Sequence, residues 1–339
     1  MSACCGARRD FAPSPLTKKK PVDAPEGPTA RLGPPKISKD DLILWCQNHL
    51  GARPAAELFT TGHLSLVMGL RLSDGQDVVI KARPPARRLS GCFVAQDVLH
   101  ARGFPCPAPL VAPAPLGALS ATAERHVPGG EPLAAAPHTT ELYASALARL
   151  LACAPAPTEL PSVEPAPPWA AWDHGEPGVW PVPDDRHADL NAHPGPRWLD
   201  DLGRRVRARL ANVTAPDVIG HVDWEAHNLR WIGEQLHAVH DWDSIAARPE
   251  ATIVGLAAAV HTASGEPLTE ATDDQIDDFL TAYGEARSHA LTIDERELAW
   301  AAGLWVRAFN AKKDSLDGDD PSLDRLAAEA PRRLRLAGA

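Results

Sequence analysis

Two pairs of short apolar segments, each interrupted by a turn signal, stand out in the pattern of hydrophobic and polar positions. The first pair covers residues 66–72 and 77–81, on either side of an Asp-Gly turn. The second pair covers residues 229–232 and 235–240, on either side of a Gly-Glu turn. Short runs of this kind around a glycine-containing turn are typical of β-hairpins. The sequence therefore predicts two hairpins that lie far apart along the chain.

Apolar residues spaced three or four positions apart predict helices on both sides of these hairpins. One helix is expected to begin after Ser38, whose hydroxyl can cap it, and to run to His49. A second is expected over residues 91–102, with Gly103 marking its end. Further helices are expected over residues 141–151, 198–210, 250–262, 272–288 and 293–313.

Polar side chains gather at the two open ends of the second hairpin. Asp223 and Asn228 precede its first strand in the pattern H-x-D-x-x-x-x-N, and Asp241 follows its second strand. Because a hairpin brings its open ends together, we expect the three side chains to face one cation. Carboxylate and amide oxygens suit Mg²⁺, and a carboxylate can accept a hydroxyl proton. We therefore predict Asp223 as the catalytic base of a phosphoryl transfer and Asn228 and Asp241 as metal ligands.

This arrangement resembles the aminoglycoside phosphotransferase and choline kinase-like superfamily, which are small-molecule relatives of the protein kinases. Most members have H-G-D where this chain has Val222 between the His and the Asp, and a Val there requires an ordinary negative φ. The resemblance spans roughly residues 40 to 315. It implies an α+β, two-lobed protein-kinase-like fold, with a small N-terminal lobe of antiparallel sheet and one helix and a larger, mostly helical C-terminal lobe. It also implies ATP and Mg²⁺ as cofactors.

The resemblance assigns the first hairpin to a nucleotide-binding lobe. Lys81 ends its second strand, and a compact ammonium suits contact with phosphate oxygens. Gly62 and Ser65 belong to a segment that resembles the loop covering the nucleotide. Arg125 and Val127 fall in a segment that resembles the hinge between the lobes, where backbone groups would bind adenine. These five residues are the expected nucleotide contacts.

The family pairs its phosphate-binding Lys with a Glu from the following helix, and residues 91–102 contain no Glu. Gln96 lies towards the apolar face of that helix. We expect Gln96 to make a neutral hydrogen bond towards Lys81, or the pair to be absent. Because of this departure, a nucleotide-binding pseudoenzyme stays open beside an active kinase.

A long segment rich in Pro and Trp separates the helix ending near residue 151 from the next one. A connection of this length is usually a functional lid or a linker. Aromatic faces together with carboxylates suit a cationic, partly apolar ligand, and packing of the Trp residues onto the lobe is the equal alternative. Asp173 and Glu176 from this segment, with Glu225 and Asp243 beside the catalytic motifs, are the candidate substrate contacts. Asp243 is equally compatible with a second metal ion.

Composition limits the partners and the location. The chain has 339 residues, 44% of them hydrophobic, which is enough for two lobes with cores of their own. A net charge of −10 argues against nucleic acid or an anionic membrane as the main partner. The six Cys have no metal-type spacing and the N-terminus has no apolar signal core. We therefore expect a cytoplasmic protein with free thiols, and the oligomeric state stays open.

Four regions are expected along the chain. Residues 1–36 form a disordered basic tail, 37–127 the nucleotide-binding lobe, 128–315 the catalytic and substrate lobe, and 316–339 a C-terminal extension. The Arg-rich residues 331–339 are expected to be solvated like the N-terminal tail, because neither end carries enough apolar side chains to offset the ordering entropy.

Two questions stay open from the sequence. His221, Asp223 and His227 have side chains that also suit a zinc site, although no Cys lies near them. The acceptor is the second question. The resemblance implies a small molecule with a hydroxyl, first an aminoglycoside-type or related antibiotic, so that phosphorylation would confer resistance. A metabolic alcohol such as a sugar, choline or an amino-acid-like compound is the alternative.

Overall fold

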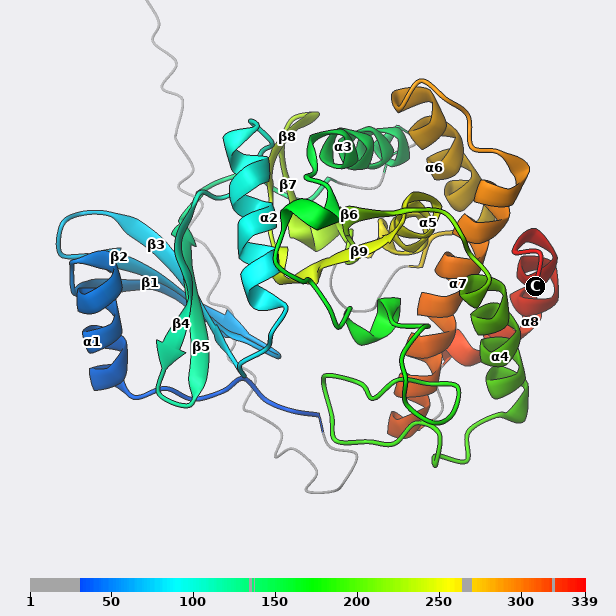
Figure 1. Cartoon of the computed structure of the whole chain (residues 1–339), viewed down its shortest axis with the longest axis horizontal. Coiled ribbons are helices and arrows are strands. Elements are labelled where there is room, and N and C mark those ends of the chain that lie inside the picture. Colours follow the sequence, from blue (N-terminus) through cyan, green and yellow to red (C-terminus); the bar gives the residue numbers. More distant parts are fainter. Residues whose placement is uncertain (1–30, 134–135, 137, 264–269, 319–320) are drawn as a thin grey trace, which may run out of the picture.

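The computed structural model describes residues 31–133, 136, 138–263, 270–318 and 321–339. A five-stranded sheet lies at one end of the molecule and a larger group of helices at the other (Figure 1). The predicted α+β, two-lobed arrangement is therefore present.

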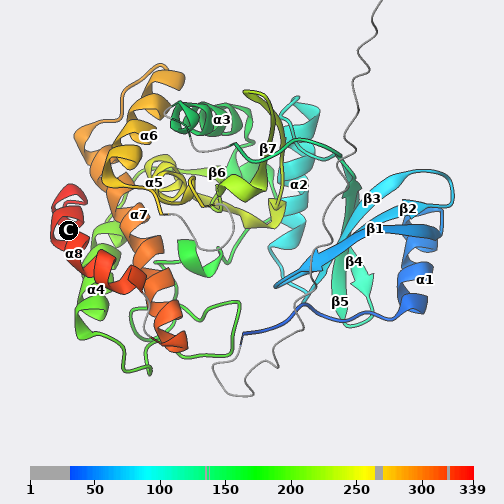
Figure 2. The ribbon, with the colours of Figure 1, turned by 180° about the vertical axis from the view of Figure 1, so that it is seen from behind.

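The smaller lobe is an antiparallel sheet with the strand order β1-β2-β3-β5-β4. Its strands are β1 (Pro54–Gly62), β2 (Leu66–Leu72), β3 (Asp77–Arg83), β4 (Pro109–Leu116) and β5 (Leu119–Arg125). The first predicted hairpin is β2 with β3, and its Asp-Gly turn has Gly75 at a φ of 88°. Helix α1 (Lys39–Leu50) covers the outer side of the sheet (Figure 2). The Ser38 hydroxyl caps this helix by accepting from Asp41 N at 3.0 Å.

Helix α2 (Leu89–Ala101) lies between the sheet and the larger lobe (Figure 1). Its buried residues Cys92, Ala95 and Leu99 belong to the core of the larger lobe rather than to that of the sheet. At its first turn, Arg88 donates to the backbone carbonyls of Asp243 and Ile245. The helix expected in the nucleotide-binding region thus packs across the boundary, because its apolar face is completed by residues of the other lobe.

The larger lobe is built from helices around two small antiparallel sheets. The helices are α3 (Thr139–Cys153), α4 (Arg197–Ala211), α5 (Glu250–Val260), α6 (Asp273–Ala286), α7 (Ile293–Asp314) and α8 (Pro321–Leu336). The sheets pair β6 (Asp217–His221) with β9 (Ile245–Pro249), and β7 (Leu229–Ile232) with β8 (Gln235–Val239). Short 3-10 helices are η1 (Pro157–Glu159), η2 (Pro168–Ala170), η3 (Ala226–Asn228), η4 (Trp242–Ser244) and η5 (Ser315–Asp317).

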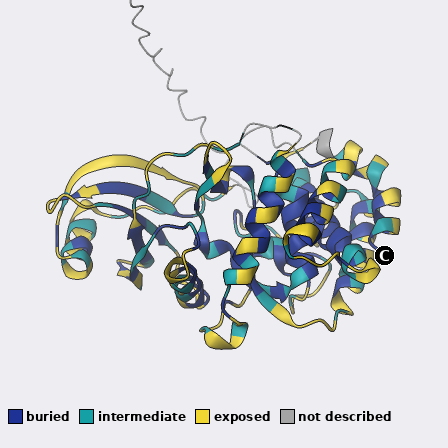
Figure 3. Ribbon diagram, turned by 90° about the horizontal axis from the view of Figure 1, so that it is seen from above, coloured by how far each residue is buried: buried dark blue, intermediate teal, exposed yellow. Residues whose placement is uncertain are grey.

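The core of this lobe is centred on α5 and α7, whose contact is close enough that a Cβ on Gly255 would lie 1.9 Å from the Ala299 carbonyl oxygen. Buried residues accordingly concentrate inside the helical lobe (Figure 3). In the part of the chain that the structure describes, no helix combines the length and apolar character needed to cross a membrane.

The expectation of solvated ends was wrong for residues 331–339. Residues 331–336 form the last part of α8, which packs against α7 and α4, and Leu334 and Ala337 are buried. The Arg333 guanidinium is almost fully buried and pairs with Asp273 at 2.9 Å and Glu329 at 2.7 Å. The composition of residues 331–339 was a poor guide because the Arg333 charge is neutralised by carboxylates of α6 and of α8 itself.

Residues 31–36, which were expected to belong to the N-terminal tail, are described by the structure. Arg31 pairs with Asp317 at 2.8 Å, and Leu32 N donates to the Asp185 carbonyl at 2.6 Å. The segment before α1 therefore lies against the larger lobe. Residues 1–30 lie outside the described part of the chain.

The Trp-rich segment between α3 and α4 packs onto the lobe. Trp172 and Trp180 are 4% and 1% exposed, and Trp180 stacks on Trp305 with ring centroids 5.5 Å apart. Trp169 Nε1 donates to the Val222 carbonyl at 2.9 Å. Of the two alternatives that the sequence left open for these rings, packing onto the lobe is the one observed for Trp172 and Trp180.

Candidate active site

The second predicted hairpin, β7 with β8, joins the polar residues at its two ends. Gly233 makes its turn with a φ of 60°. At the open end, the His240 amide donates to the Asn228 carbonyl at 2.8 Å. Asp241 follows directly in the left-handed region, with φ 64° and ψ 49°, and begins η4. The backbone thus brings the Asn228 and Asp241 positions together, as the pattern predicted.

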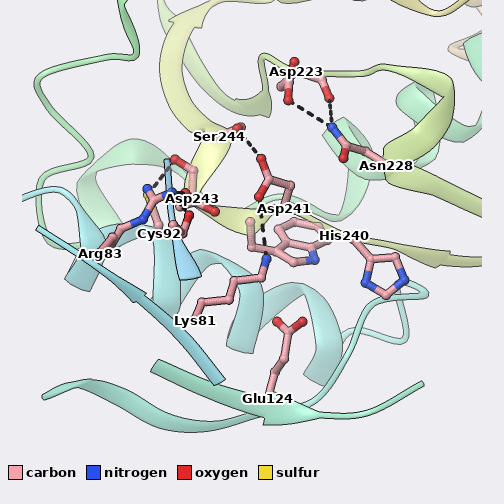
Figure 4. A network of polar contacts seen from close by, with 12 residues as sticks. Lys81, Arg83, Cys92, Glu124, Asp223, Asn228, His240, Asp241, Asp243 and Ser244 are labelled. Carbon is pink, nitrogen blue, oxygen red and sulfur yellow. Dashed lines mark hydrogen bonds and ion pairs between the residues drawn. The ribbon is translucent and has the colours of Figure 1, made fainter. Parts of the chain in front are cut away.

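Asp223 is held by the loop that precedes the hairpin. Asn228 Nδ2 donates to both the Asp223 carbonyl and its carboxylate oxygen Oδ2, each at 2.9 Å (Figure 4). The Asp223 amide contacts His221 Nδ1 at 3.2 Å. Because the amide nitrogen of Asn228 is used in this way, its side-chain oxygen is the atom left to act as a ligand.

His221 has a structural role in this loop. Burial lowers the pKa of its imidazole to about 4, so the ring is neutral at pH 7. Nδ1 accepts from the Asp223 amide, and Nε2 donates to the His240 carbonyl at 3.0 Å. Both ring nitrogens are committed, so His221 does not suit a zinc ion. Across the described ranges, no group of three or more His, Cys, Asp and Glu side chains is arranged to hold a metal.

Val222, at the position where the resemblance implied a Gly, fits the loop without backbone strain. Val222 is 1% exposed and packs in the core of the larger lobe. Asp241 and Ser288 are the described non-glycine residues with positive φ, so Val222 has the ordinary backbone that its side chain requires.

An ion pair crosses from the sheet to the hairpin. Lys81 Nζ of β3 lies 3.6 Å from Asp241 Oδ1, and the Ser244 hydroxyl donates to Asp241 Oδ2 at 3.0 Å (Figure 4). Burial acts to raise the pKa of Asp241, but the Lys81 ammonium and other neighbours outweigh it and lower the pKa below its ordinary value. For Lys81, burial acts to lower the pKa, and nearby carboxylates outweigh it and raise the pKa. Both groups are therefore charged at neutral pH.

The expected hydrogen bond from Gln96 to Lys81 is not formed. Gln96 Nε2 donates instead to Glu124 Oε2 at 3.0 Å and to the Pro107 carbonyl at 2.9 Å. Glu124 lies on β5, on the same face of the sheet as Lys81, and points towards it (Figure 4). It is also the strongest of the carboxylates that raise the pKa of Lys81. The negative charge that α2 lacks is thus supplied by Glu124 of β5. The sequence of the helix gives no sign of it.

A second ion pair, which sequence reasoning missed, lies beside the first. Arg83 of β3 pairs with Asp243 of η4, and its guanidinium also donates to the Ser65 hydroxyl at 2.7 Å. The available signal was that Arg83 stands two positions after Lys81 and therefore on the same face of the strand. Lys81, Arg83, Gln96, Glu124 and Asp243 all line one pocket between the lobes.

Neither a family profile nor a curated protein sequence matches the chain. Solved structures do match. They include an amicoumacin kinase in complex with AMP-PNP and Ca²⁺, at a TM-score of 0.60 and 12% identity over 85% of this chain and 89% of the kinase. A spectinomycin phosphotransferase in complex with ADP and spectinomycin matches at a TM-score of 0.54 and 14% identity, over 89% and 94% of the two chains. A choline/ethanolamine kinase family protein from Mesorhizobium loti matches at 0.50 and 15%, over 83% and 88%. The chain has the fold of the small-molecule kinases.

Within this small-molecule kinase fold, the predicted nucleotide contacts lie in the smaller lobe. Gly62 ends β1 with a φ of 152°, and a Cβ there would lie 2.0 Å from the Ser65 carbonyl oxygen, so the turn requires Gly. At the other end of the sheet, the Arg125 amide donates to the Ala108 carbonyl at 2.8 Å. The amide of Arg125 is therefore used within the sheet, whereas Val127 lies beyond the end of β5.

Glu225 lies in the acidic part of the site. Its carboxylate is 3.2 Å from His227 Nδ1. Burial and the Asp241 charge raise the pKa of Glu225 to about 7, against an opposing effect of Lys313. Burial, followed by the charges of Glu225 and Asp241, also raises the pKa of Asp223 well above its ordinary value. The raised pKa values of Asp223 and Glu225 therefore come first from burial and then from repulsion between neighbouring carboxylates.

The two predicted substrate contacts from the Trp-rich segment, Asp173 and Glu176, are not among the residues that surround Lys81 and Asp241. Asp173 pairs with Arg248 of β9 at 2.9 Å, and Glu176 is exposed on the following loop. Asp184 of the same segment was not predicted. Burial raises the pKa of Asp184, and the charges of Lys313 and Arg83 act on this pKa in the opposite direction, so Asp184 lies within electrostatic reach of the Arg83–Asp243 pair.

Proposed function

We propose that the protein is an ATP-dependent phosphotransferase that moves the γ-phosphoryl group to a hydroxyl of a small molecule. The observation that carries the proposal is the pairing of Lys81 with Asp241 across the two lobes, directly beside Asp223 and Asn228. Phosphoryl transfer needs a cation for the phosphate oxygens, ligands for a metal and a group that orients the hydroxyl. These side chains meet all three needs.

The donor set fits Mg²⁺. The Asp241 carboxylate is ionised because its pKa is lowered, and the Asn228 side-chain oxygen is free of the hydrogen bonds that occupy its nitrogen. Both are hard oxygen ligands, and Mg²⁺ typically takes one or two such groups together with waters and phosphate oxygens. When bound, the ion would neutralise negative charge on the phosphates. Lys81 would contact a phosphate oxygen, and Glu124 holds the ammonium charged in that position.

Asp223 would take the proton of the attacking hydroxyl. Its carboxylate is fixed by Asn228 Nδ2 at 2.9 Å, which leaves the other oxygen, Oδ1, for the substrate. A base is most effective when its pKa lies near the working pH, and the surroundings of Asp223 raise its pKa in that direction. In the transfer, the hydroxyl oxygen forms a bond to the γ-phosphorus, the bond to the ADP oxygen breaks, and the proton passes to Asp223.

We infer that the acceptor is cationic, with an aminoglycoside-type or related antibiotic as the first candidate. Glu225 adds negative charge beside Asp223, and an amine on the substrate would relieve the carboxylate repulsion that, after burial, raises the pKa of both groups. Of the four predicted substrate contacts, Glu225 remains in this proposal. Asp173 and Asp243 are used in ion pairs with arginines. Antibiotic resistance and a cytoplasmic location follow as parts of the same proposal.

A metabolic alcohol is the alternative acceptor, since a choline/ethanolamine kinase family protein shares the fold. A nucleotide-binding pseudoenzyme was the other alternative, based on the absent helix Glu and on the Val at position 222. Glu124 provides a negative charge next to Lys81, and Val222 has an ordinary backbone, so neither departure argues against catalysis.

The test is ADP release with a panel of hydroxylated antibiotics, sugars and choline, using variants of the site. Asp223→Asn should keep Mg-ATP binding and lose roughly 10²- to 10⁴-fold in kcat, the usual contribution of a general base. Asp241→Asn should lose the effect of Mg²⁺ on ATP binding. Asp278→Asn, at an exposed position on α6, is the matched control and should behave like the wild type. No ADP release with any acceptor, or full turnover in Asp223→Asn, would contradict the proposal.

A further inference from the structure

Two cation–carboxylate pairs cross between the lobes in matching register. Lys81 and Arg83 occupy alternate positions of β3, and Asp241 and Asp243 occupy alternate positions at the start of η4. Lys81 meets Asp241, and Arg83 meets Asp243. Alternate residues of a strand share one face, so Lys81 and Arg83 both face η4. When Lys81 meets Asp241, Arg83 is therefore placed next to Asp243.

The second pair has a further connection that the first lacks. The Arg83 guanidinium donates to the Ser65 hydroxyl at 2.7 Å. Ser65 lies at the tight turn between β1 and β2, where Gly62 is required by its close approach to the Ser65 carbonyl. Arg83 therefore connects this turn of the smaller lobe to the segment that carries Asp241.

Asp243 is held firmly on its own side of the contact. The Arg88 guanidinium at the start of α2 donates to the Asp243 carbonyl, and Cys92 Sγ lies 3.9 Å from the same oxygen. The Arg83 and Asp243 side chains are only 21% and 14% exposed. A pair this well shielded is weakly screened by salt, and loss of one member leaves an unpaired buried charge.

We propose that Arg83 and Asp243 form an interlobe clasp that sets the Gly62–Ser65 turn in register with the metal-binding residue Asp241. The clasp rests on the proposed function. Lys81 and Asp241 are the groups that a nucleotide and its metal would recruit, so their mutual ion pair is exchanged for new contacts on binding. The clasp uses neither group and persists, which keeps the turn and the metal ligand aligned. Arg83 is thus a positioning residue rather than a catalytic one.

The experiment is a double-mutant cycle on nucleotide affinity. Mg-ATP and metal-free ATP are titrated by calorimetry into the wild type, Arg83→Met, Asp243→Asn and the double variant. Each single change should weaken Mg-ATP binding about tenfold, and the double variant should be no weaker than either single one. The affinity for metal-free ATP should change less, because the clasp aligns the Gly62–Ser65 turn with Asp241, and Asp241 is the proposed ligand of the metal. A purely structural role would lower the melting temperature without this dependence on Mg²⁺.

Arg71→Met is the matched control, because Arg71 forms an exposed ion pair with Asp77 at 2.8 Å on the same sheet and should leave ATP binding unchanged. If Arg83→Met does not fold, Arg83→Gln replaces it in the cycle.

Wild-type affinity in the Arg83 variant, or losses that simply add in the double variant, would overturn the clasp. Coupling in the cycle without phosphorylation of any acceptor would refute the proposed function and leave the clasp standing. Phosphorylation of an acceptor without coupling in the cycle would refute the clasp and leave the proposed function standing. A wild type that does not bind Mg-ATP would refute the clasp and the proposed function together.

Discussion

Replacement of Glu225 by Gln should stabilise the protein in a pH-dependent way. The Glu225 side chain is 18% exposed, and burial together with the charge of Asp241 raises its pKa from 4.5 to about 7. The folded protein therefore keeps this proton up to about pH 7, whereas the unfolded chain releases it near pH 4.5. The stability that the group contributes is fully present below pH 4.5 and is lost as the pH rises to about 7.

The size of the effect follows from the displacement of the pKa. One pKa unit corresponds to about 1.4 kcal/mol, so the ionised group destabilises the fold by about 3 kcal/mol once the pH exceeds 7. Gln keeps the shape of the side chain and removes the charge. At pH 8, Glu225→Gln should therefore raise the free energy of unfolding by about 2–3 kcal/mol. At pH 4.5 the variant and the wild type should be nearly equal.

Urea unfolding followed by tryptophan fluorescence at pH 4.5 and pH 8 measures this difference. Glu285→Gln, at an exposed position on α6, is the control and should change the free energy of unfolding equally little at both values. The reasoning is refuted if Glu225→Gln shifts the free energy of unfolding by the same amount at both pH values. The same variant should bind a cationic acceptor more weakly, because Glu225 is the proposed partner of an amine.

Two further predictions concern the other lobe and the core. Glu124→Gln should weaken Mg-ATP binding about tenfold in a titration, because Lys81 loses a neighbouring charge, and adding Gln96→Glu should restore most of the affinity by returning a carboxylate to that position. A double variant as weak as Glu124→Gln would show that charge beside Lys81 is not what matters. Gly255→Ala should destabilise the fold by about 3 kcal/mol in thermal or urea unfolding, since the added Cβ meets a backbone oxygen. Gly175→Ala, at a position with open space, should have little effect, and equal melting temperatures for the two would contradict the packing argument.

Local patterns in the sequence were sufficient for the two hairpins, for helices α1 to α7 and for the proximity of the Asn228 and Asp241 positions. The turn at Gly233, the cap at Ser38 and the spacing of Asp223, Asn228 and Asp241 all depend on interactions within a few residues or within one hairpin. Such interactions are specified by side-chain size, hydrogen-bonding groups and backbone freedom, and all of these are visible in the sequence. The α+β, two-lobed arrangement was expected from the resemblance that these motifs bear to small-molecule kinases, and not from the local patterns themselves.

Contacts between distant segments were decided only by the tertiary structure. The charge beside Lys81 comes from Glu124 on a paired strand, and the partner of Asp243 is Arg83 from the other lobe. The basic C-terminal residues, which suggested a solvated tail, are buried because α8 finds acidic partners such as Asp273. Each of these outcomes depends on strand register and on which faces pack together. Those are properties of the whole chain, and no single segment contains the information that sets them.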